Sequence, residues 1–109
     1  MRRRASKYGN KQVLYEGIKF HSKKEAKRYQ ELKLLEKAGE VSNVRCQEAF
    51  ILEAYGEKIC TYRADFCYTD VLNQKGVIED VKGVRTAVFN IKWKLLKAQY
   101  KDQYIYKIT

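Results

Sequence analysis

The sequence predicts a single α/β (α+β) domain in which two helices alternate with β-strands in the core order α-β-β-β-α-β. Helical and β-like hydrophobic periods alternate along the chain, and its 109 residues suffice for one modest core. A hydrophobic fraction of 45% excludes a wholly disordered chain. The sequence contains no Pro, no internal repeat and no linker-like stretch over residues 22–109, so one folding unit is expected.

The first predicted elements are a short hairpin and a helix. Residues 13–20 contain two β-like runs around a central Glu-Gly pair, which is typical of a tight turn. Ser22 and Glu25 have the spacing of a capping box and predict the start of a helix. This helix continues over residues 22–38, and Gly39 is its expected stop.

Three strands are expected between the two helices. They cover residues 44–52, 58–69 and 77–82, with turns at 54–57 and 73–76. The middle strand alternates in character, which predicts one face with Tyr62, Ala64, Phe66 and Tyr68 and another with Thr61, Arg63, Asp65 and Cys67.

A second helix is predicted over residues 87–101, followed by a strand at 104–108. Apolar residues recur along the helix at intervals of three and four, which predicts a core-facing stripe of Val88, Ile91, Leu95 and Ala98. A separate basic stripe consists of Lys94, Lys97 and Lys101.

Charge is concentrated in the first part of the chain. The formal net charge is +10, and residues 1–29 account for +8 of it, with ten bases and two acids. Such a patch on a small domain favours a polyanionic partner, bound through phosphate contacts. We favour nucleic acid over a merely solvated basic surface. An anionic membrane is a third alternative, although no amphipathic anchor accompanies the charge.

Several classes of protein are disfavoured by composition. No run of residues approaches the length of a membrane span, and the amino terminus lacks the apolar segment of a signal peptide, so a cytoplasmic protein is expected. His21 is the sole histidine, which disfavours histidine-dependent catalysis. Cys46, Cys60 and Cys67 contain no C-x-x-C pair, so reduced and partly buried thiols are expected.

Two aspartates and a lysine are expected to meet on neighbouring strands. Asp80 and Lys82 point to the same side of their strand, because side chains repeat every two residues. The preceding turn brings Asp65 close to Lys82. Crowded carboxylates favour a bound cation, and Mg²⁺ accepts one or two carboxylates together with waters and phosphate oxygens. These residues therefore suit phosphodiester hydrolysis. A surface ion pair between Asp80 and Lys82 is the simpler alternative.

In this order of elements, Asp65 with the later Asp80-Val81-Lys82 resembles the PD-(D/E)XK nuclease superfamily. Nearly the whole chain is also similar to a family of small phage and prophage proteins regarded as nucleases related to junction-resolving and restriction endonucleases. The segments that carry the similarity are SKYGNK (6–11), FHSKKEAKRY (20–29), YRADF (62–66) and EDVKG (79–83). The resemblance implies a restriction-endonuclease-like domain over residues 13–109, preceded by a basic arm over 1–12. Ala64 stands where the superfamily pattern has Pro.

The resemblance also implies a site. Asp65 and Asp80 would bind Mg²⁺ or Mn²⁺, Lys82 would position the attacking water, and the Val81 carbonyl would be a further ligand. Glu25 occupies the place of a helix-borne glutamate ligand, and a capping-box role is its alternative. The family commonly has a Gln in the first long strand, matched by Gln47, for which an ordinary strand residue is the alternative. No organic cofactor is expected.

Basic residues are expected to contact the backbone of DNA, and Tyr8 of the basic arm is expected to stack on a base. A lysine stem lying along the core edge is the alternative for one of them, Lys92. The set comprises Arg2, Arg3, Arg4, Lys7, Tyr8, Lys11, Lys23, Lys92, Lys94 and Lys97.

The resulting hypothesis is a metal-dependent DNA endonuclease of a bacterial or phage-infected cytoplasm. Cleavage is expected to be structure-specific, on branched or junction DNA, or weakly sequence-specific, because no base-reading motif is present. Two active sites suit the two strands of a branch, which favours a homodimer. The alternatives are a non-catalytic nucleic-acid-binding protein that retains the nuclease fold, and a protein that acts on RNA.

Overall fold

The computed structural model describes residues 12–109. The first elements are a small hairpin of β1 (Val13–Tyr15) and β2 (Ile18–Phe20), followed by helix α1 (Lys23–Lys37). The Ser22 hydroxyl caps α1 by accepting a hydrogen bond from the backbone N–H of Glu25, as the sequence predicts. Gly39, with a φ of 81°, follows the end of the helix and confirms the expected stop.

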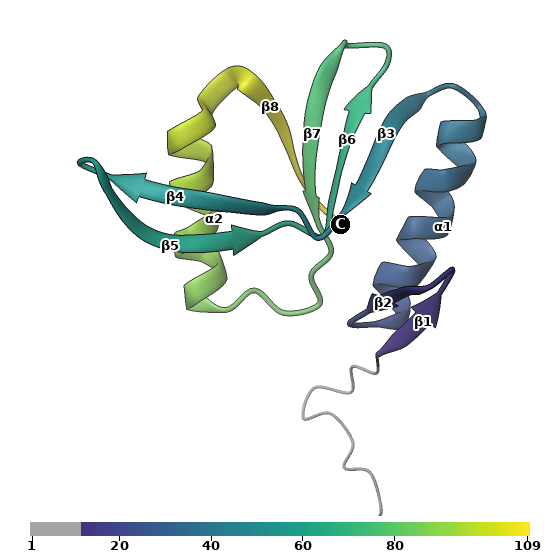
Figure 1. Cartoon of the computed structure of the whole chain (residues 1–109), viewed down its shortest axis with the longest axis horizontal. Helices are drawn as coiled ribbons and strands as arrows, with labels where there is room; N and C mark the ends of the chain where they lie inside the picture. Colours follow the sequence, from purple (N-terminus) through teal and green to yellow (C-terminus); the bar gives the residue numbers. More distant parts are fainter. Residues whose placement is uncertain (1–11) are drawn as a thin grey trace, which may run out of the picture.

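A four-stranded sheet forms the centre of the domain (Figure 1). Its strands are β3 (Val41–Cys46), β6 (Phe66–Asp70), β7 (Lys75–Asp80) and β8 (Tyr104–Ile108), in that spatial order. The first three are antiparallel, and β8 is parallel to β7. Helix α2 (Ala87–Tyr100) and a short 3₁₀ turn (Lys101–Gln103) make the crossover from β7 to β8. The mixed α/β class is therefore confirmed.

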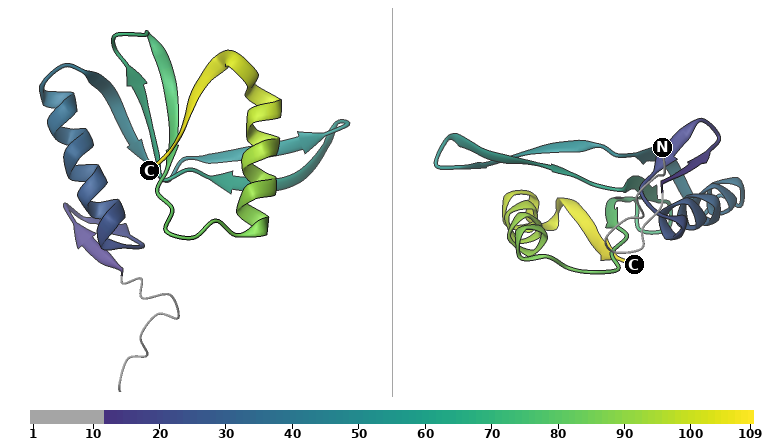
Figure 2. Two further views of the ribbon diagram at one scale, coloured as in Figure 1. Left: turned by 180° about the vertical axis from the view of Figure 1, so that it is seen from behind. Right: turned by 90° about the horizontal axis from the view of Figure 1, so that it is seen from below.

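The hairpin of β4 (Ala49–Ala54) and β5 (Glu57–Arg63) leaves the central sheet and extends over α2 (Figure 2). Two hydrogen bonds join it to the sheet: Gln47 N–H donates to the Asp65 carbonyl, and Ala64 N–H donates to the Glu48 carbonyl. The pairing of β3 with β6 therefore continues into that of β4 with β5 as one ribbon that bends at these residues.

This bend corrects two sequence predictions. The expected strand over 44–52 is divided into β3 and β4 at Gln47, whose φ of 58° turns the chain. The expected strand over 58–69 is divided into β5 and β6, so Asp65 lies at the bend and not in the middle of a strand. The turn before β7 falls earlier than the expected 73–76. β7 therefore covers Lys75–Asp80 in place of the expected 77–82, and Lys82 follows the strand.

Two hydrophobic clusters cover the two faces of the sheet. One joins α1 and the first hairpin to the sheet through Phe20, Tyr29, Leu32, Phe66 and Tyr68, among others. The second joins α2 to the β4–β5 hairpin and the sheet through Phe50, Leu52, Tyr62, Ile78 and Trp93, among others. The four residues expected to share one face of the middle strand, Tyr62, Ala64, Phe66 and Tyr68, are all buried, but they divide between the two clusters.

The core-facing stripe predicted for α2 is wrong except at Leu95, which is half-buried against the second cluster. Val88 and Ile91 are 62% and 61% exposed, whereas the buried residues of the helix are Phe89, Trp93 and Leu96. The helical spacing of the predicted stripe is correct, but the buried residues Phe89 and Leu96 each lie one position later than the predicted Val88 and Leu95. Three large side chains at i, i+4 and i+7 fill the space against Tyr62 and Phe50, and the smaller β-branched residues remain outside.

Within residues 12–109, no helix has the length and hydrophobicity needed to cross a membrane. The three cysteines are free thiols, with Cys67 buried and Cys46 and Cys60 half-buried.

Candidate active site

The bend in the ribbon and the end of β7 bring the predicted carboxylates together. Phe66 pairs with Glu79 in the β6–β7 ladder, so Asp65 and Asp80 are the next residues along their two strands. Asp80 is the last residue of β7, and Lys82 follows two positions later. The side chains that the sequence places in one cluster do meet at this edge of the sheet.

Asp80 is almost completely buried, with 1% of its surface exposed. Its Oδ2 accepts a hydrogen bond from the Tyr62 hydroxyl. Its Oδ1 forms an ion pair with the Lys82 ammonium 3.0 Å away. Apart from this ion pair, Oδ1 is a buried oxygen without a hydrogen-bond donor among the described residues. Such an atom in a native structure requires a physical explanation, and an ion is one.

Asp65 is half-buried beside Asp80 and is fixed by the backbone of the opposite strand. Its Oδ2 accepts a 2.7 Å hydrogen bond from the Val81 N–H. Burial, the charge of Asp80 and a hydrogen bond shared with Asp80 together raise the pKa of the Asp65 carboxyl to about 8. Without a cation, the pair therefore retains a proton at neutral pH.

Glu25 enters the site from the first turn of α1 and is 6% exposed. Burial raises its pKa, and the charges of Asp80 and Lys82 act on it in opposite directions. The capping role is partly realised. The Glu25 carboxylate lies 3.5 Å from the His21 N–H, one residue before the helix cap. Glu25 therefore lies at the start of α1, and its carboxylate is close enough to Asp80 and Lys82 to interact with their charges.

The Lys82 ammonium is held between a carboxylate and an aromatic ring. It lies 3.0 Å from Asp80 Oδ1 and 4.6 Å from the centroid of the Phe89 ring. Its side chain is 29% exposed, so it borders both the buried pair and the solvent. The Lys82 carbonyl accepts a 3.3 Å hydrogen bond from the Lys24 ammonium, a contact that the sequence did not indicate.

The donor set fits a hard divalent cation held by two carboxylates. Among residues 12–109, no three acidic, histidine or cysteine side chains form a ready-made metal cluster. Mg²⁺ nevertheless accepts two carboxylates with waters completing its shell. An ion at Asp65 and Asp80 would offset their repulsion and give Asp80 Oδ1 a second cationic partner beside Lys82. The Val81 N–H already bonds Asp65, so the carbonyl is the ligand this residue could add.

A family model described as a protein of unknown function, DUF1064, matches residues 5–109, nearly the whole chain. The chain belongs to this family. No curated protein and no solved structure matches it. The four segments that carry the sequence resemblance all lie within the DUF1064 match.

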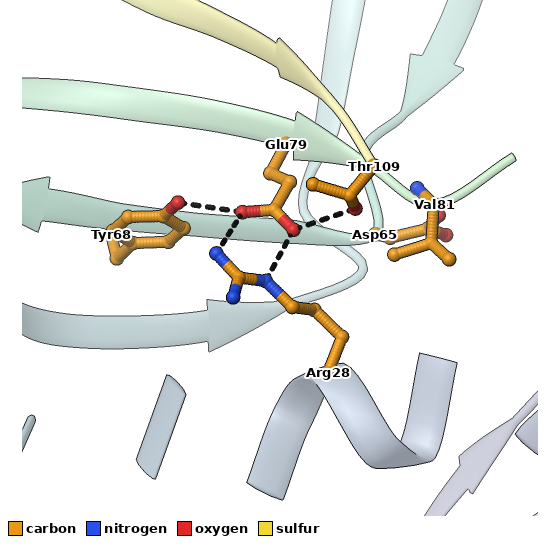
Figure 3. Close-up of polar contacts among 6 residues, drawn as sticks. All are labelled: Arg28, Asp65, Tyr68, Glu79, Val81 and Thr109. Atoms are coloured by element: carbon orange, nitrogen blue, oxygen red, sulfur yellow. Dashed lines mark hydrogen bonds and ion pairs between the residues drawn. The ribbon is translucent and has the colours of Figure 1, made fainter. Parts of the chain in front are cut away.

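Beside the carboxylate pair, the DUF1064 domain contains a buried ionic network that the sequence analysis did not predict (Figure 3). Glu79 is fully buried and binds Arg28 of α1 through two hydrogen bonds of 2.7 and 3.0 Å. It also accepts hydrogen bonds from the hydroxyls of Tyr68, at 2.6 Å, and Thr109, at 2.9 Å. One sequence signal was present: Arg28 lies one helical turn after Glu25 and therefore on the same side of α1.

Burial and these hydrogen bonds have opposite effects on the pKa of Glu79. Burial alone raises the pKa of its carboxyl, but the hydrogen bonds from Arg28 and Tyr68 outweigh this and hold the pKa below its ordinary value. The pKa of Arg28 is correspondingly raised, chiefly by its hydrogen bond to Glu79. Glu79 is therefore a fixed negative charge on the α1 side of the sheet, paired and separate from the Asp65–Asp80 pair.

Tyr62 is a second residue of the site for which the sequence pattern predicted only a shared strand face with Ala64. It is 3% exposed and reaches Asp80 from the β4–β5 hairpin. The bend at Asp65 makes this contact possible, because it turns β5 toward α2 while β6 stays in the central sheet.

The predicted DNA-contacting residues fall into three groups. Lys23, Lys94 and Lys97 are exposed, as is Lys101 of the same stripe. Lys92 is half-buried, and its ammonium donates a 3.1 Å hydrogen bond to the Thr61 carbonyl, so it joins α2 to β5. The remaining candidates lie outside the described residues: Arg2, Arg3, Arg4, Lys7, Tyr8 and Lys11.

The side chains of two glutamines, the family-matched Gln47 and Gln99 of α2, bond the backbone. The Gln47 side-chain amide donates to the Lys19 carbonyl at 2.9 Å and ties the bend to the first hairpin. Gln99 of α2 accepts from the Glu53 N–H and donates to the Ile51 carbonyl, both at 2.9 Å. Gln99 thereby fixes the β4–β5 hairpin over the helix.

Proposed function

We propose that this protein is a metal-dependent endonuclease that hydrolyses phosphodiester bonds in DNA. The observation that carries the proposal is the arrangement of Asp80: a buried carboxylate beside Asp65, with one oxygen lacking a hydrogen-bond donor among the described residues and a lysine ammonium 3.0 Å away. Crowded carboxylates next to a cationic side chain are what a phosphoryl-transfer site requires. The arrangement also supports the proposed relation to PD-(D/E)XK nucleases.

In this mechanism Asp65 and Asp80 hold Mg²⁺ or Mn²⁺, with Glu25 and the Val81 carbonyl as further candidates. When bound, the ion polarises the phosphodiester and lowers the pKa of a water. Lys82 borders solvent, so its ammonium can orient the attacking water and offset negative charge on the phosphate oxygens. Tyr62 fixes the Asp80 carboxylate by donating to its other oxygen.

The nucleic-acid partner is proposed from charge. A net charge of +10 on 109 residues supports binding through phosphates. Exposed Lys94 and Lys97 lie on α2, whose buried face packs near the site, and exposed Lys101 begins the 3₁₀ turn that follows it. No base-reading element is apparent within residues 12–109, so structure-specific cleavage of branched DNA or weakly sequence-specific cleavage is proposed. A homodimer would cut both strands of a branch.

Cleavage of plasmid and branched DNA by purified protein tests the activity. We expect cutting with Mg²⁺ or Mn²⁺ and none in EDTA. D80N should lower the rate by about 100-fold or more, because it removes a charge aimed at the reacting centre. D102N, at an exposed aspartate of the 3₁₀ turn, is the matched control and should cut like wild type. Equal cutting by D80N and D102N would show that the site is wrongly assigned.

Thermal unfolding tests the metal site without activity. Mn²⁺ at 100 times its Kd should stabilise the folded protein by about 2.7 kcal/mol, and D65N or D80N should abolish the rise in Tm. DNA binding without cutting and without a Mn²⁺ effect would instead support a non-catalytic nucleic-acid-binding protein. Cutting of single-stranded or structured RNA in preference to DNA would assign RNA as the substrate.

A further inference from the structure

The segment from Glu79 to Lys82 carries three of the proposed site residues, and hydrogen bonds hold each of its four residues. Glu79 is held through its carboxylate by Arg28, Tyr68 and Thr109. Val81 is held through its N–H by Asp65. Asp80 and Lys82 are held through their backbones by Thr109.

Thr109 bonds the backbones of both Asp80 and Lys82. Its N–H donates a 2.9 Å hydrogen bond to the Asp80 carbonyl, and its carbonyl accepts a 3.0 Å hydrogen bond from the Lys82 N–H. The last pair of the β7–β8 ladder is Asp80 with Ile108, and the Thr109 contacts continue the pairing one residue beyond it. The backbones of Asp80 and Lys82 are therefore tied to the same residue.

The side chain of Thr109 is fixed in turn by Glu79. The Thr109 hydroxyl donates to Glu79 Oε2 at 2.9 Å, and the same oxygen accepts the 2.7 Å hydrogen bond from Arg28 Nε. Glu79 is fully buried and its other oxygen is bound by Tyr68 and Arg28. Figure 3 shows the side chains of Arg28, Tyr68 and Thr109 converging on the Glu79 carboxylate. These contacts restrict motion because the loss of one partner would leave the buried Glu79 charge incompletely compensated, which is strongly destabilising.

The geometry points to Thr109 as the positioning residue that holds Asp80 and Lys82 in register. Glu79 fixes the Thr109 side chain, and Arg28 and Tyr68 hold Glu79 in turn. This inference rests on the proposed function for its consequence in catalysis, but its structural content does not depend on that function. Arg28 acts from α1, Tyr68 from β6 and Thr109 from the end of β8, so three elements fix the point at which β7 ends. Small displacements of reacting groups cost large factors in rate.

The test compares hydroxyl removals at matched sites. T109V keeps the shape of threonine without its hydroxyl, and T109S keeps the hydroxyl. Y68F removes the other hydroxyl bound to Glu79. Y106F is the control, because the Tyr106 hydroxyl bonds the Lys101 carbonyl at 2.8 Å, away from the network. The measurements are single-turnover cleavage, DNA affinity in EDTA, and hydrogen exchange of the Lys82 amide.

We expect T109V and Y68F to slow cleavage by about tenfold with DNA affinity unchanged within about twofold. Exchange of the Lys82 amide should become about tenfold faster, as expected for the loss of one buried hydrogen bond. T109S should restore both measurements, and Y106F should match wild type.

The outcomes separate this inference from the proposed function. Exchange at Lys82 that is equal in T109V, Y68F and Y106F overturns the positioning role, whatever the cleavage rates are. If wild type does not cut DNA but T109V and Y68F accelerate exchange at Lys82, the nuclease proposal fails and the positioning of the segment stands. A rate loss in T109V that is accompanied by equal loss of DNA affinity would assign Thr109 to binding and overturn the inference.

Discussion

The backbone N–H of Val81 donates a 2.7 Å hydrogen bond to Oδ2 of Asp65, which fixes the Asp65 carboxylate at the end of β7 beside Asp80. The hydrogen bond favours the charged form of Asp65, whereas burial and Asp80 oppose it more strongly. Ionisation of a carboxyl held in this way costs free energy, and a bound cation would lower that cost. The stability of the protein should report that cost.

The stability of the metal-free protein should fall as pH rises from about 4 to about 8. Unfolded chains release the Asp65 proton near pH 3.8, whereas the folded protein releases it at about 8. Between these values the folded state binds more protons, so the free energy of unfolding decreases with pH. For one proton the slope is at most about 1.4 kcal/mol per pH unit.

The measurement is Tm against pH in EDTA for wild type and D65N. Asn cannot ionise and keeps an oxygen that can accept from the Val81 N–H, so the difference between the two curves isolates this group. Wild type should lose Tm relative to D65N between pH 5 and 8. Parallel curves across that range would show that Asp65 is an ordinary ionised carboxylate in the folded protein.

The buried pair of Arg28 and Glu79 should make a large and non-additive contribution to stability. R28M leaves a charged carboxylate buried without its main partner and should cost about 3–5 kcal/mol. The double variant R28M/E79M removes the stranded charge and should be more stable than R28M alone. Urea unfolding of both variants measures the difference.

An exposed pair on the same helix provides the control. Lys33 and Glu36 lie 2.7 Å apart near the surface, so K33M should cost under about 1 kcal/mol. A cost for R28M no greater than that for K33M would mean that Glu79 is protonated or solvated when Arg28 is removed.

Local signals in the sequence predicted much of this fold. Ser22 and Gly39 bound α1 because a side-chain cap and a positive φ are properties of single residues. The meeting of Asp65, Asp80 and Lys82 followed from a period of two and a hairpin turn, and both survive a small error in the turn position.

Non-local features were not predicted. The bend at Gln47 and Asp65 leaves the alternation of residues 58–69 intact, so a straight strand and a bent one have the same pattern. Gln47 adopts a φ of 58° without being Gly or Asn, and its hydrogen bond to Lys19 reaches across the fold. The contact of Arg28 with Glu79 spans 51 positions, and no local pattern encodes such a pair.

The corrected core face of α2 gives a further prediction. Trp93 packs against Tyr62, Phe89 and Tyr106, so W93A should destabilise the protein by about 3–5 kcal/mol. Ile91 lies two positions earlier but is 61% exposed, and I91A should change stability by no more than about 0.5 kcal/mol. Denaturant unfolding compares the two. A cost for I91A near that for W93A would mean that a partner surface covers Ile91 in solution.

The basic arm should dominate the salt dependence of DNA binding. Residues 1–11 contain five bases and no acid: Arg2, Arg3, Arg4, Lys7 and Lys11. Each base that neutralises a phosphate of duplex DNA contributes about 0.9 to the slope of log K against log salt. Replacing residues 1–11 by a neutral Gly/Ser segment of equal length should therefore lower the slope by up to about 4.5.

The double variant K94Q/K97Q tests the α2 stripe in the same assay. It should lower the slope by up to about 1.8, because two exposed lysines are removed. The two effects should add if the arm and the stripe contact separate phosphates. A slope that stays at the wild-type value after the arm is replaced, but falls in K94Q/K97Q, would place the DNA backbone on α2 alone and leave the arm without a role in binding.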